Sequence, residues 1–332
     1  MAIYHLSSKF IGRAAGRSAI EAAAYRHAAK MVDEIKMRTV SFESKSNVAH
    51  AEIALPRETP DWLANKLLGK GVDQQSEALW NAVEAFEKRK DAQLARETVI
   101  ALPVELTPEQ NMDLTREFVA SLTARGQVAD WAFHNEPGNP HVHIMTTLRA
   151  LTEEGFGPKR LAVLDEGGQP LKYSDGKRTR GVYTLFNGEK DDLKAERALW
   201  QDLTNAHLLK HGHDVTIDHR SFADRGIDLV PTVHRGPVEF YSEELGKDRC
   251  LQLEQIAEQN AALLTECPEI IFAQLTDNMS VFDADDIARK VHTYIPDADA
   301  FQSVLARLVN SDELVRLSEE VSEGAHTVKA KY

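Results

Sequence analysis

Residues 128–148 read VADWAFHNEPGNPHVHIMTTL, and this stretch decides the fold of the chain. Two runs rich in apolar residues flank Glu136-Pro-Gly-Asn139, a sequence that is typical of a tight turn. We therefore expect a strand over residues 128–134, a turn, and a returning strand over residues 141–148. Together these segments predict a β-hairpin.

Three histidines lie near the closed end of this hairpin. His141 and His143 are two residues apart on one strand, so their side chains leave the same face, and His134 ends the partner strand. Opposed residues of a hairpin have Cβ atoms about 4.5–5.5 Å apart, so three imidazoles can converge on one cation. Three protein ligands leave a position open for substrate, which favours a catalytic metal site. Hydrogen-bonded histidines within a sheet are the alternative.

The sequence on either side of the hairpin mixes strand and helix patterns. Further strands are expected at residues 3–6, 47–55 and 97–102, and helices at residues 18–31, 77–93, 107–124 and 189–211. Residues 150–182 are rich in Gly, Lys and Arg and are expected to form a long surface excursion.

After about Pro237 the character of the sequence changes. An acidic helical connector is expected over residues 238–266. Helices are then expected at residues 268–275, 283–294 and 297–310, followed by short strands at residues 314–317 and 327–330. This order resembles a small winged-helix module. We therefore divide the chain into residues 1–237, 238–266 and 267–332.

Composition is that of a globular protein, with 332 residues, 42% hydrophobic and 27% charged. No run of about 18 apolar residues predicts a membrane span, and the N-terminus lacks the apolar core of an export signal. The two cysteines, Cys250 and Cys267, are too few for a disulfide framework and fit a reducing cytoplasm.

The net charge of −13 is unevenly distributed. Residues 1–235 hold 31 basic and 33 acidic residues, whereas residues 236–332 hold 8 and 19. Residues 1–50 hold 8 basic and 4 acidic residues. Because the local field matters more than the total charge, the acidic balance does not exclude a phosphate backbone as partner for the first 235 residues.

One tyrosine and two carboxylates are further candidates. Tyr25 lies on an Ala-rich helix, where it is either a nucleophile or a packing residue, and composition alone does not select it over Tyr4 or Tyr183. Asp130 shares a strand face with His134 and can orient a histidine. Glu97 begins a strand that we expect nearby, and surface or capping roles are the alternative for both carboxylates.

Several separate motifs resemble the MobA/MobL (MOBQ-type) family of conjugative relaxases, within the HUH superfamily. In chain order they are MAIYHLSSK, RSAIEAAAYRHAAKM, ARETVIALP, VADWAFHNEPGNPHVHIMTTLR and TIDHRSFADRGID, which together cover about residues 1–235. The nearest resemblance is to TraA-type relaxases of rhizobial plasmids. Residues 268–332 also resemble the segment after the relaxase in those long proteins, which then continue into a helicase, so a chain ending at Tyr332 would be a truncated piece.

The resemblance implies a fold and a chemistry. The fold is α+β, with a central antiparallel sheet and flanking helices that resemble an RNA-recognition palm. Tyr25 matches the family's nucleophile, and Glu97 matches a recurrent acidic position. The triad of His134, His141 and His143 matches the family's metal site. The implied activity is metal-dependent, strand-specific nicking of a plasmid transfer origin through a 5′-phosphotyrosine, followed by religation without a nucleotide cofactor.

Three nitrogen ligands favour Mn, Co, Ni or Zn over Mg, but availability in the cell leads us to expect Mn²⁺ or Mg²⁺. The implied partners are single-stranded or extruded transfer-origin DNA, relaxosome accessory proteins and a type IV secretion coupling protein, in the cytoplasm of a bacterial donor without membrane insertion. The candidate DNA contacts are Lys9, Arg13, Arg17, Lys177, Arg178 and Arg220. Trp131 or Phe133 is a candidate to stack a base, with core packing as the alternative.

Three other functions are alternatives for this sequence. A rolling-circle replication or transposition initiator shares the histidine and tyrosine chemistry. A hydrolytic metalloenzyme would use the triad to activate water and leave Tyr25 as a packing residue. A DNA-binding scaffold without enzymatic activity would rely on the C-terminal module, although its acidity argues against direct DNA contact.

Overall fold

The computed structural model describes residues 4–174, 179–231, 243–276, 279, 281–318, 321–323, 326–328 and 330–332. Contacts divide the chain into two compact units, Met1–His211 and Gly212–Tyr332. None of the helices in these described ranges has the length and apolar character that a membrane span requires.

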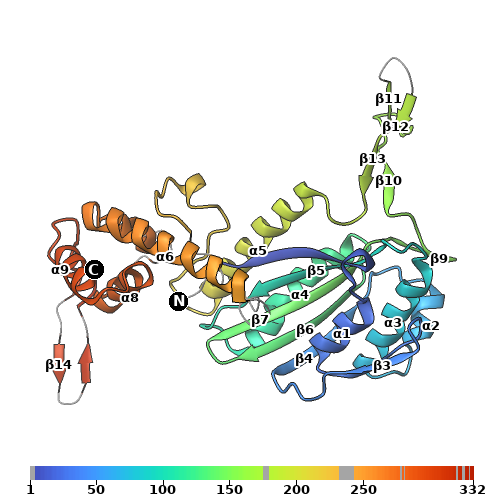
Figure 1. Ribbon diagram of the computed structural model, residues 1–332, viewed down its shortest axis with the longest axis horizontal. Coiled ribbons are helices and arrows are strands. Elements are labelled where there is room, and N and C mark those ends of the chain that lie inside the picture. Colours follow the sequence, from blue (N-terminus) through green and yellow to red (C-terminus); the bar gives the residue numbers. More distant parts are fainter. Residues whose placement is uncertain are drawn as a thin grey trace. The chain divides into compact units, whose positions relative to one another are not determined.

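A five-stranded sheet forms the centre of the first unit (Figure 1). Its order is β1-β5-β7-β6-β4, and every neighbouring pair is antiparallel. The strands are β1 (Leu6–Gly12), β4 (Val48–Ala54), β5 (Gln93–Ala101), β6 (Ala129–Glu136) and β7 (Asn139–Thr147). The hairpin expected from residues 128–148 is confirmed as β6 and β7, with β7 as the central strand.

Helices cover both faces of this sheet, which confirms the expected α+β fold. One face is covered by α1 (Ala19–His27), α2 (Asp61–Leu67) and α3 (Val72–Phe86), and the other by α4 (Pro108–Ala124) and α5 (Lys190–Lys210). On the α1 face, Ile20 and Trp80 pack in one core with Met145 of β7. On the α4 face, the Phe118 ring meets Trp200 of α5 edge-on at 5.4 Å.

Helix α1 ends four residues before the expected end at residue 31. Ala28 adopts the left-handed region at φ +51°, which is unfavourable for a residue with a Cβ. The backbone N–H of Ala29 then bonds the Ala24 carbonyl, and Met31 enters strand β2 (Lys30–Asp33) as a fully buried residue. Tertiary packing of Met31 therefore overrides the helical pattern of the local sequence. Strand β2 pairs with β3 (Arg38–Ser41).

The boundaries of two other expected elements were also wrong. The strand expected at residues 3–6 begins at Leu6. The helix expected at residues 77–93 is α3, which begins at Val72 and ends at Phe86, and Gln93 already belongs to β5. A short 3₁₀ turn, η1 (Arg13–Ala15), joins β1 to α1.

The excursion expected over residues 150–182 folds into three small two-stranded sheets. They pair β8 (Leu151–Thr152) with β9 (Gly155–Phe156), β10 (Arg160–Ala162) with β13 (Tyr183–Leu185), and β11 (Lys172–Ser174) with β12 (Thr179–Gly181). The β10–β13 and β11–β12 pairs form a ribbon that projects from the central sheet (Figure 1).

The second unit confirms the expected order of three helices and a hairpin. Its elements are η2 (Ala223–Arg225), α6 (Glu243–Glu266), α7 (Ile270–Thr276), α8 (Ala284–Tyr294), α9 (Ala298–Val309), β14 (Val321–Glu323) and β15 (His326–Val328). Strands were expected at residues 314–317 and 327–330, whereas the structure pairs β14 with β15 and joins Ser318 to Lys331 by an isolated bridge.

Residues before the expected boundary at 237 already belong to the second unit. Ile227 and Leu229 pack in the same core as Leu264 of α6. The backbone of Val230 exchanges two hydrogen bonds of 2.8 Å with the Asn260 amide. Residue 237 itself lies outside the described residues, so the three-part division stays a prediction.

Candidate metal and nucleophile site

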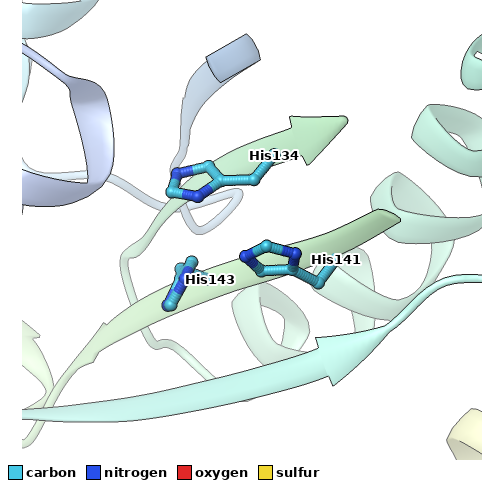
Figure 2. Close-up of side chains that lie close together, drawn as sticks. All are labelled: His134, His141 and His143. Carbon is cyan, nitrogen blue, oxygen red and sulfur yellow. The ribbon is translucent and has the colours of Figure 1, made fainter. Parts of the chain in front are cut away.

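The three histidines of the hairpin converge at one end of the sheet (Figure 2). His134 of β6 is directly opposite His141 of β7, and His143 follows on the same face of β7. Their ring centroids lie 4.8–5.2 Å apart, and one nitrogen from each ring lies within 4.8 Å of the others. This geometry can hold one metal ion, as the spacing predicted.

Each imidazole has one nitrogen engaged in a hydrogen bond. Nε2 of His134 donates to the Arg26 carbonyl at 2.7 Å, and Nδ1 of His141 donates to the Asn139 carbonyl at 2.8 Å. Nδ1 of His143 faces Oε1 of Glu97 at 3.3 Å. These contacts favour the tautomers in which the second nitrogen of each ring carries the lone pair. On His134 this nitrogen is Nδ1, which also lies 3.5 Å from the Asn47 amide nitrogen. The donor set therefore fits a divalent transition metal.

Burial keeps two of these rings neutral. It lowers the pKa of His134 to about 4, against the hydrogen bond to Arg26. Burial, followed by the charges of Arg26, His141 and Lys45, lowers the pKa of His143 to about 3. A neutral imidazole is the form that binds a metal ion, so neither ring has to lose a proton near pH 7.

Glu97 connects the triad to a cluster of cations. Its carboxylate is almost fully buried on β5 and pairs with the guanidinium of Arg26 as well as with His143. Its Oε2 lies 3.3 Å from Nζ of Lys9 and 3.6 Å from Nη2 of Arg17. Three basic side chains therefore surround one carboxylate, so the field beside the triad attracts anions.

Tyr25 projects from the last turn of α1, and its side chain is 44% exposed. The Phe42 ring meets it edge-on at a centroid distance of 5.3 Å, and Nζ of Lys45 lies 3.6 Å from its ring centroid. The next residue, Arg26, supplies the carbonyl that His134 bonds. The helix that carries Tyr25 is thus attached directly to the histidine cluster.

The end of α1 is held by a buried ion pair that the sequence did not indicate. Nε2 of His27 lies 2.6 Å from Oδ1 of Asp130, and its Nδ1 lies 3.0 Å from Asp73. The other Asp130 oxygen accepts from Ser76 and Trp80 of α3, each at 2.6 Å. Burial disfavours the charge on His27, but Asp130 and Asp73 outweigh it and raise its pKa to about 10.

Asp130 therefore does orient a histidine, but the partner is His27 and not a member of the triad. The expectation that Asp130 orients a histidine is confirmed in this sense, and a catalytic role for Asp130 stays a prediction.

A family model described as the MobA/MobL family matches residues 17–243. The chain belongs to the MobA/MobL family. This MobA/MobL chain is 44% identical over 329 residues to a "Probable conjugal transfer protein TraA" of Sinorhizobium fredii, covering 96% of the chain and 30% of that protein.

Two further matches support the family. The chain is 36% identical over 264 residues to "Mobilization protein MobL" of Acidithiobacillus ferridurans, covering 71% of the chain and 62% of that protein. A solved structure from "Molecular Basis of Vancomycin Resistance Transfer in Staphylococcus aureus" is 30% identical with a TM-score of 0.54, and the match covers 66% of the chain and all of that protein. The chain spans about 30% of the TraA relative's length.

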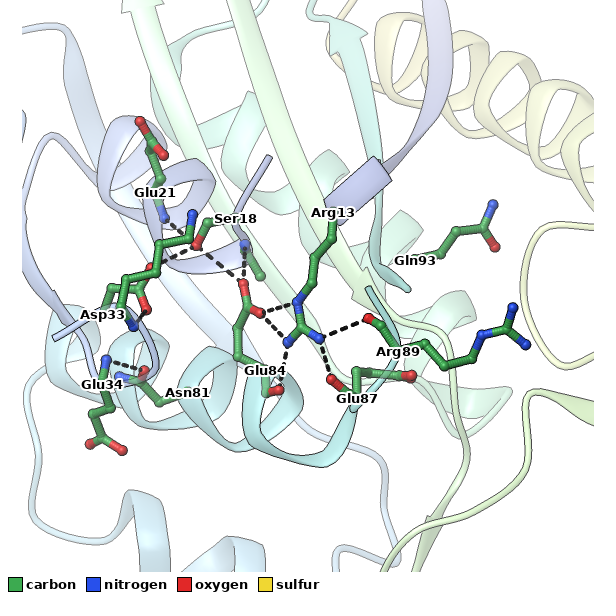
Figure 3. A network of polar contacts seen from close by, with 12 residues as sticks. Arg13, Ser18, Glu21, Asp33, Glu34, Asn81, Glu84, Glu87, Arg89 and Gln93 are labelled. Atoms are coloured by element: carbon green, nitrogen blue, oxygen red, sulfur yellow. Dashed lines mark hydrogen bonds and ion pairs between the residues drawn. The ribbon is translucent and has the colours of Figure 1, made fainter. Parts of the chain in front are cut away.

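Arg13, which was expected to contact DNA, forms an ion pair and hydrogen bonds within this MobA/MobL chain (Figure 3). Its Nη2 lies 2.6 Å from the Glu84 carboxylate, and it also donates to the backbone carbonyls of Glu84, Glu87 and Arg89. The second Glu84 oxygen accepts from Ser18 and from the backbone N–H of Ala19. Glu84 of α3 therefore caps α1 and binds Arg13, and a DNA contact by Arg13 stays a prediction.

The other expected DNA contacts are distributed differently. Lys9 and Arg17 lie beside Glu97 and remain partly exposed. Lys177 and Arg178 lie outside the described residues. Arg220 pairs with Asp218 in the second unit, at 2.7 Å between Nη2 and Oδ2. Trp131 and Phe133 are fully buried, so core packing is confirmed for both.

Four residues of the site were not among the sequence candidates: Arg26, His27, Lys45 and Asn47. Arg26 and His27 directly follow Tyr25, so the YRH tripeptide was an available signal. Asn47 contacts Glu136 at 2.5 Å and lies 3.5 Å from His134. Nothing in the local sequence connects Lys45 or Asn47 to the hairpin, because that contact is made through β-sheet pairing.

Proposed function

We propose that this chain is the relaxase part of a conjugative transfer protein, which nicks one DNA strand at a transfer origin. The observation that carries the proposal is the hydrogen bond between His134 and the Arg26 carbonyl. It joins the nucleophile helix to the metal-binding strand, so the phenol of Tyr25 and the triad act on one phosphate. The family membership and the TraA and MobL names of the relatives support the same function.

In this proposal the Tyr25 oxygen attacks the scissile phosphorus in line. The bond from phosphorus to Tyr25 forms, and the bond from phosphorus to the 3′ oxygen breaks. The proton that the phenol loses balances the proton that the 3′ oxygen gains, so no nucleotide is consumed. The products are a 5′-phosphotyrosine and a free 3′-hydroxyl, and religation reverses the step.

The residues around the triad position the phosphate. His134, His141 and His143 would hold a divalent cation, for which Mn²⁺ or Mg²⁺ is our expectation. That cation supplies positive charge for a nonbridging phosphate oxygen. Glu97 orients His143, and the partly exposed Lys9 and Arg17 attract the DNA backbone. Phosphoryl transfer depends mainly on positioning and on charge, and these residues provide both.

The substrate and its setting are inferred from the same chemistry. The scissile phosphate must reach a half-buried site, so single-stranded or extruded transfer-origin DNA is the expected substrate. Relaxosome accessory proteins and a type IV secretion coupling protein are the expected partners, in the donor cytoplasm.

A denaturing gel tests the proposal. The chain, its Tyr25→Phe variant and a Tyr183→Phe control are incubated with Mn²⁺ and labelled single strands tiled across the DNA beside its own gene. Tyr183 is an exposed tyrosine on β13 and serves as the matched control. We expect a covalent protein–DNA adduct with wild type and Tyr183→Phe and none with Tyr25→Phe.

Three results would contradict the proposal. Cleavage without an adduct in all three proteins would indicate hydrolysis by metal-activated water. DNA binding with neither cleavage nor adduct across the tiled set would indicate a scaffold. Cleavage confined to a replication origin would favour a replication initiator.

A further inference from the structure

The segment between β3 and β4 contacts both parts of the proposed site. Phe42 packs edge-on against the Tyr25 ring, and the Asn47 amide lies 3.5 Å from Nδ1 of His134. Between them, the backbone N–H of Lys45 bonds the Phe42 carbonyl at 3.0 Å, which closes a turn. This turn holds the position of the Lys45 side chain relative to α1 and to the hairpin.

Lys45 is half-buried, and its Nζ lies over the ring of Tyr25, 3.6 Å from the centroid. The same nitrogen lies 3.5 Å from the Tyr25 carbonyl oxygen. Contact with the face of an aromatic ring and with a carbonyl dipole places the cation against the residue that attacks the phosphate.

The charge of Lys45 is not neutralised within the part of the chain that the structure describes. There, no carboxylate forms an ion pair with it, whereas Lys9 pairs with Glu97 and Arg13 pairs with Glu84. A half-buried cation without a carboxylate partner has capacity to bind an anionic group of a ligand. Arg26, which also lies near His143, already pairs with Glu97.

We propose that Lys45 is a further catalytic residue, which binds a nonbridging oxygen of the scissile phosphate from its place on the Tyr25 ring. This inference rests on the proposed function. Lys45 provides positive charge where the attacking oxygen and the phosphate accumulate negative charge, and it transfers no proton. The bonds formed and broken are those between phosphorus and Tyr25 and between phosphorus and the 3′ oxygen.

The test compares Lys45→Met with Lys45→Arg and with Lys36→Met. Lys36 is an exposed lysine in the turn between β2 and β3. Lys36→Met therefore removes the same charge as Lys45→Met at a position away from the Tyr25 ring. The rate of covalent adduct formation is measured on the full chain with a cleavable single strand and Mn²⁺. Affinity is measured separately for the same strand in a Tyr25→Phe background, where no adduct forms.

Loss of one positioned charge at a reacting oxygen lowers catalysis by about 10²-fold. We therefore expect Lys45→Met to form adduct about 10²-fold more slowly while strand affinity changes less than about threefold. Lys45→Arg should recover part of the rate, because it keeps a cation, and Lys36→Met should match wild type. A purely structural Lys45 would instead lower affinity and rate together, or neither.

The possible outcomes separate the two proposals. If wild type forms adduct and Lys45→Met forms it at the same rate, the role of Lys45 is overturned and the proposed function stands. If Lys45→Arg is folded and forms adduct as slowly as Lys45→Met, the loss of positive charge does not explain the lower rate and the role of Lys45 is overturned. If wild type forms no adduct with any strand of the tiled set, both proposals fail.

Discussion

Arg96 and Glu97 are neighbours in β5, but their side chains point to opposite faces of the sheet and have different kinds of partner. Arg96 points to the α5 face, where Glu196 pairs with it at 2.7 and 2.8 Å and Ser8 and Asn187 also bond it. Glu97 points to the α1 face, where the side chains of Arg26, Lys9, Arg17 and His143 share its single charge.

The buried carboxylates of Glu196 and Glu97 therefore differ in how well the surrounding cations match their charge. Glu196 satisfies a guanidinium through two matched hydrogen bonds, with Arg125 adding a longer contact of 3.3 Å, so the pair is a closed structural contact. Glu97 has more cationic than anionic neighbours, and its remaining partner is His143 of the candidate metal site. A pair in which both charges are neutralised stabilises the fold, whereas a cluster with excess positive charge can bind an anion. Four predictions test this difference.

The largest expected effect is on stability at the α5 face. Glu196→Gln removes the charge that balances buried Arg96 and should lower the free energy of unfolding by about 3–5 kcal/mol. Urea unfolding followed by tryptophan fluorescence measures it, because all four tryptophans lie in residues 1–211. Affinity for Mn²⁺ should not change, and a fall in metal affinity would abolish the distinction between the two faces.

The next effect concerns the ion pair beneath α1 and depends on pH. The folded-state pKa of His27, about 10, lies above its ordinary value of 6.5. The stabilisation from its charge is therefore complete below pH 6.5 and is lost as the pH rises through 10. Asp130→Asn should cost about 1.5–3 kcal/mol at pH 6 and much less at pH 10.

Fluorescence-detected unfolding at pH 6, 8 and 10 checks this dependence, with exposed Asp113→Asn as the control. Equal destabilisation by Asp130→Asn at all three pH values would show that His27 is not charged in the folded protein.

A smaller effect is expected at Glu97. Glu97→Gln weakens the hydrogen bond that orients His143, and loss of such a partner lowers metal affinity by about 10–100-fold. Calorimetric titration with Mn²⁺ measures the change, with Glu196→Gln as the comparison on the opposite face. Unchanged affinity in Glu97→Gln would mean that the carboxylate serves only Arg26 and the other cations.

The smallest effect separates two arginines that look alike in the sequence. Arg17→Gln should reduce the slope of log affinity against log salt for a single strand by about 0.7, the value for one phosphate contact. Arg13→Gln should leave that slope unchanged, since Glu84 already binds Arg13. Binding titrations in the presence of a chelator at several salt concentrations measure both slopes. A reduced slope for Arg13→Gln would show that Arg13 also contacts a phosphate.

Local patterns predicted the parts of the site that depend on short-range geometry. The His134, His141 and His143 cluster results from a tight turn and the alternation of side chains along two adjacent strands. The helix expected at residues 107–124 is equally local, and the structure confirms it as α4. The second unit shows the limit of such patterns, because its three helices were placed within about two residues while its weak terminal strands were not.

Long-range pairing decided the rest. Glu97 meets Arg26 across 71 residues, and Arg13 meets Glu84 across the same number. Charge alone marked Arg13 and Arg17 as equivalent, but Glu84 of α3 pairs with Arg13 at 2.6 Å, whereas Arg17 lies 3.6 Å from Glu97. His27 was not a sequence candidate, because its partners Asp73 and Asp130 are 46 and 103 residues away along the chain.

The sequence by itself determined the central hairpin, the convergence of three imidazoles and the family to which the chain belongs. These depend on residues that are close along the chain or on motifs that can be compared directly. The tertiary structure alone decided which charges are neutralised and which are available, as for Arg13, Arg17 and Lys45. The physical reason is that a charge acts according to its burial and its partners, and both are set by strands and helices that are distant in sequence.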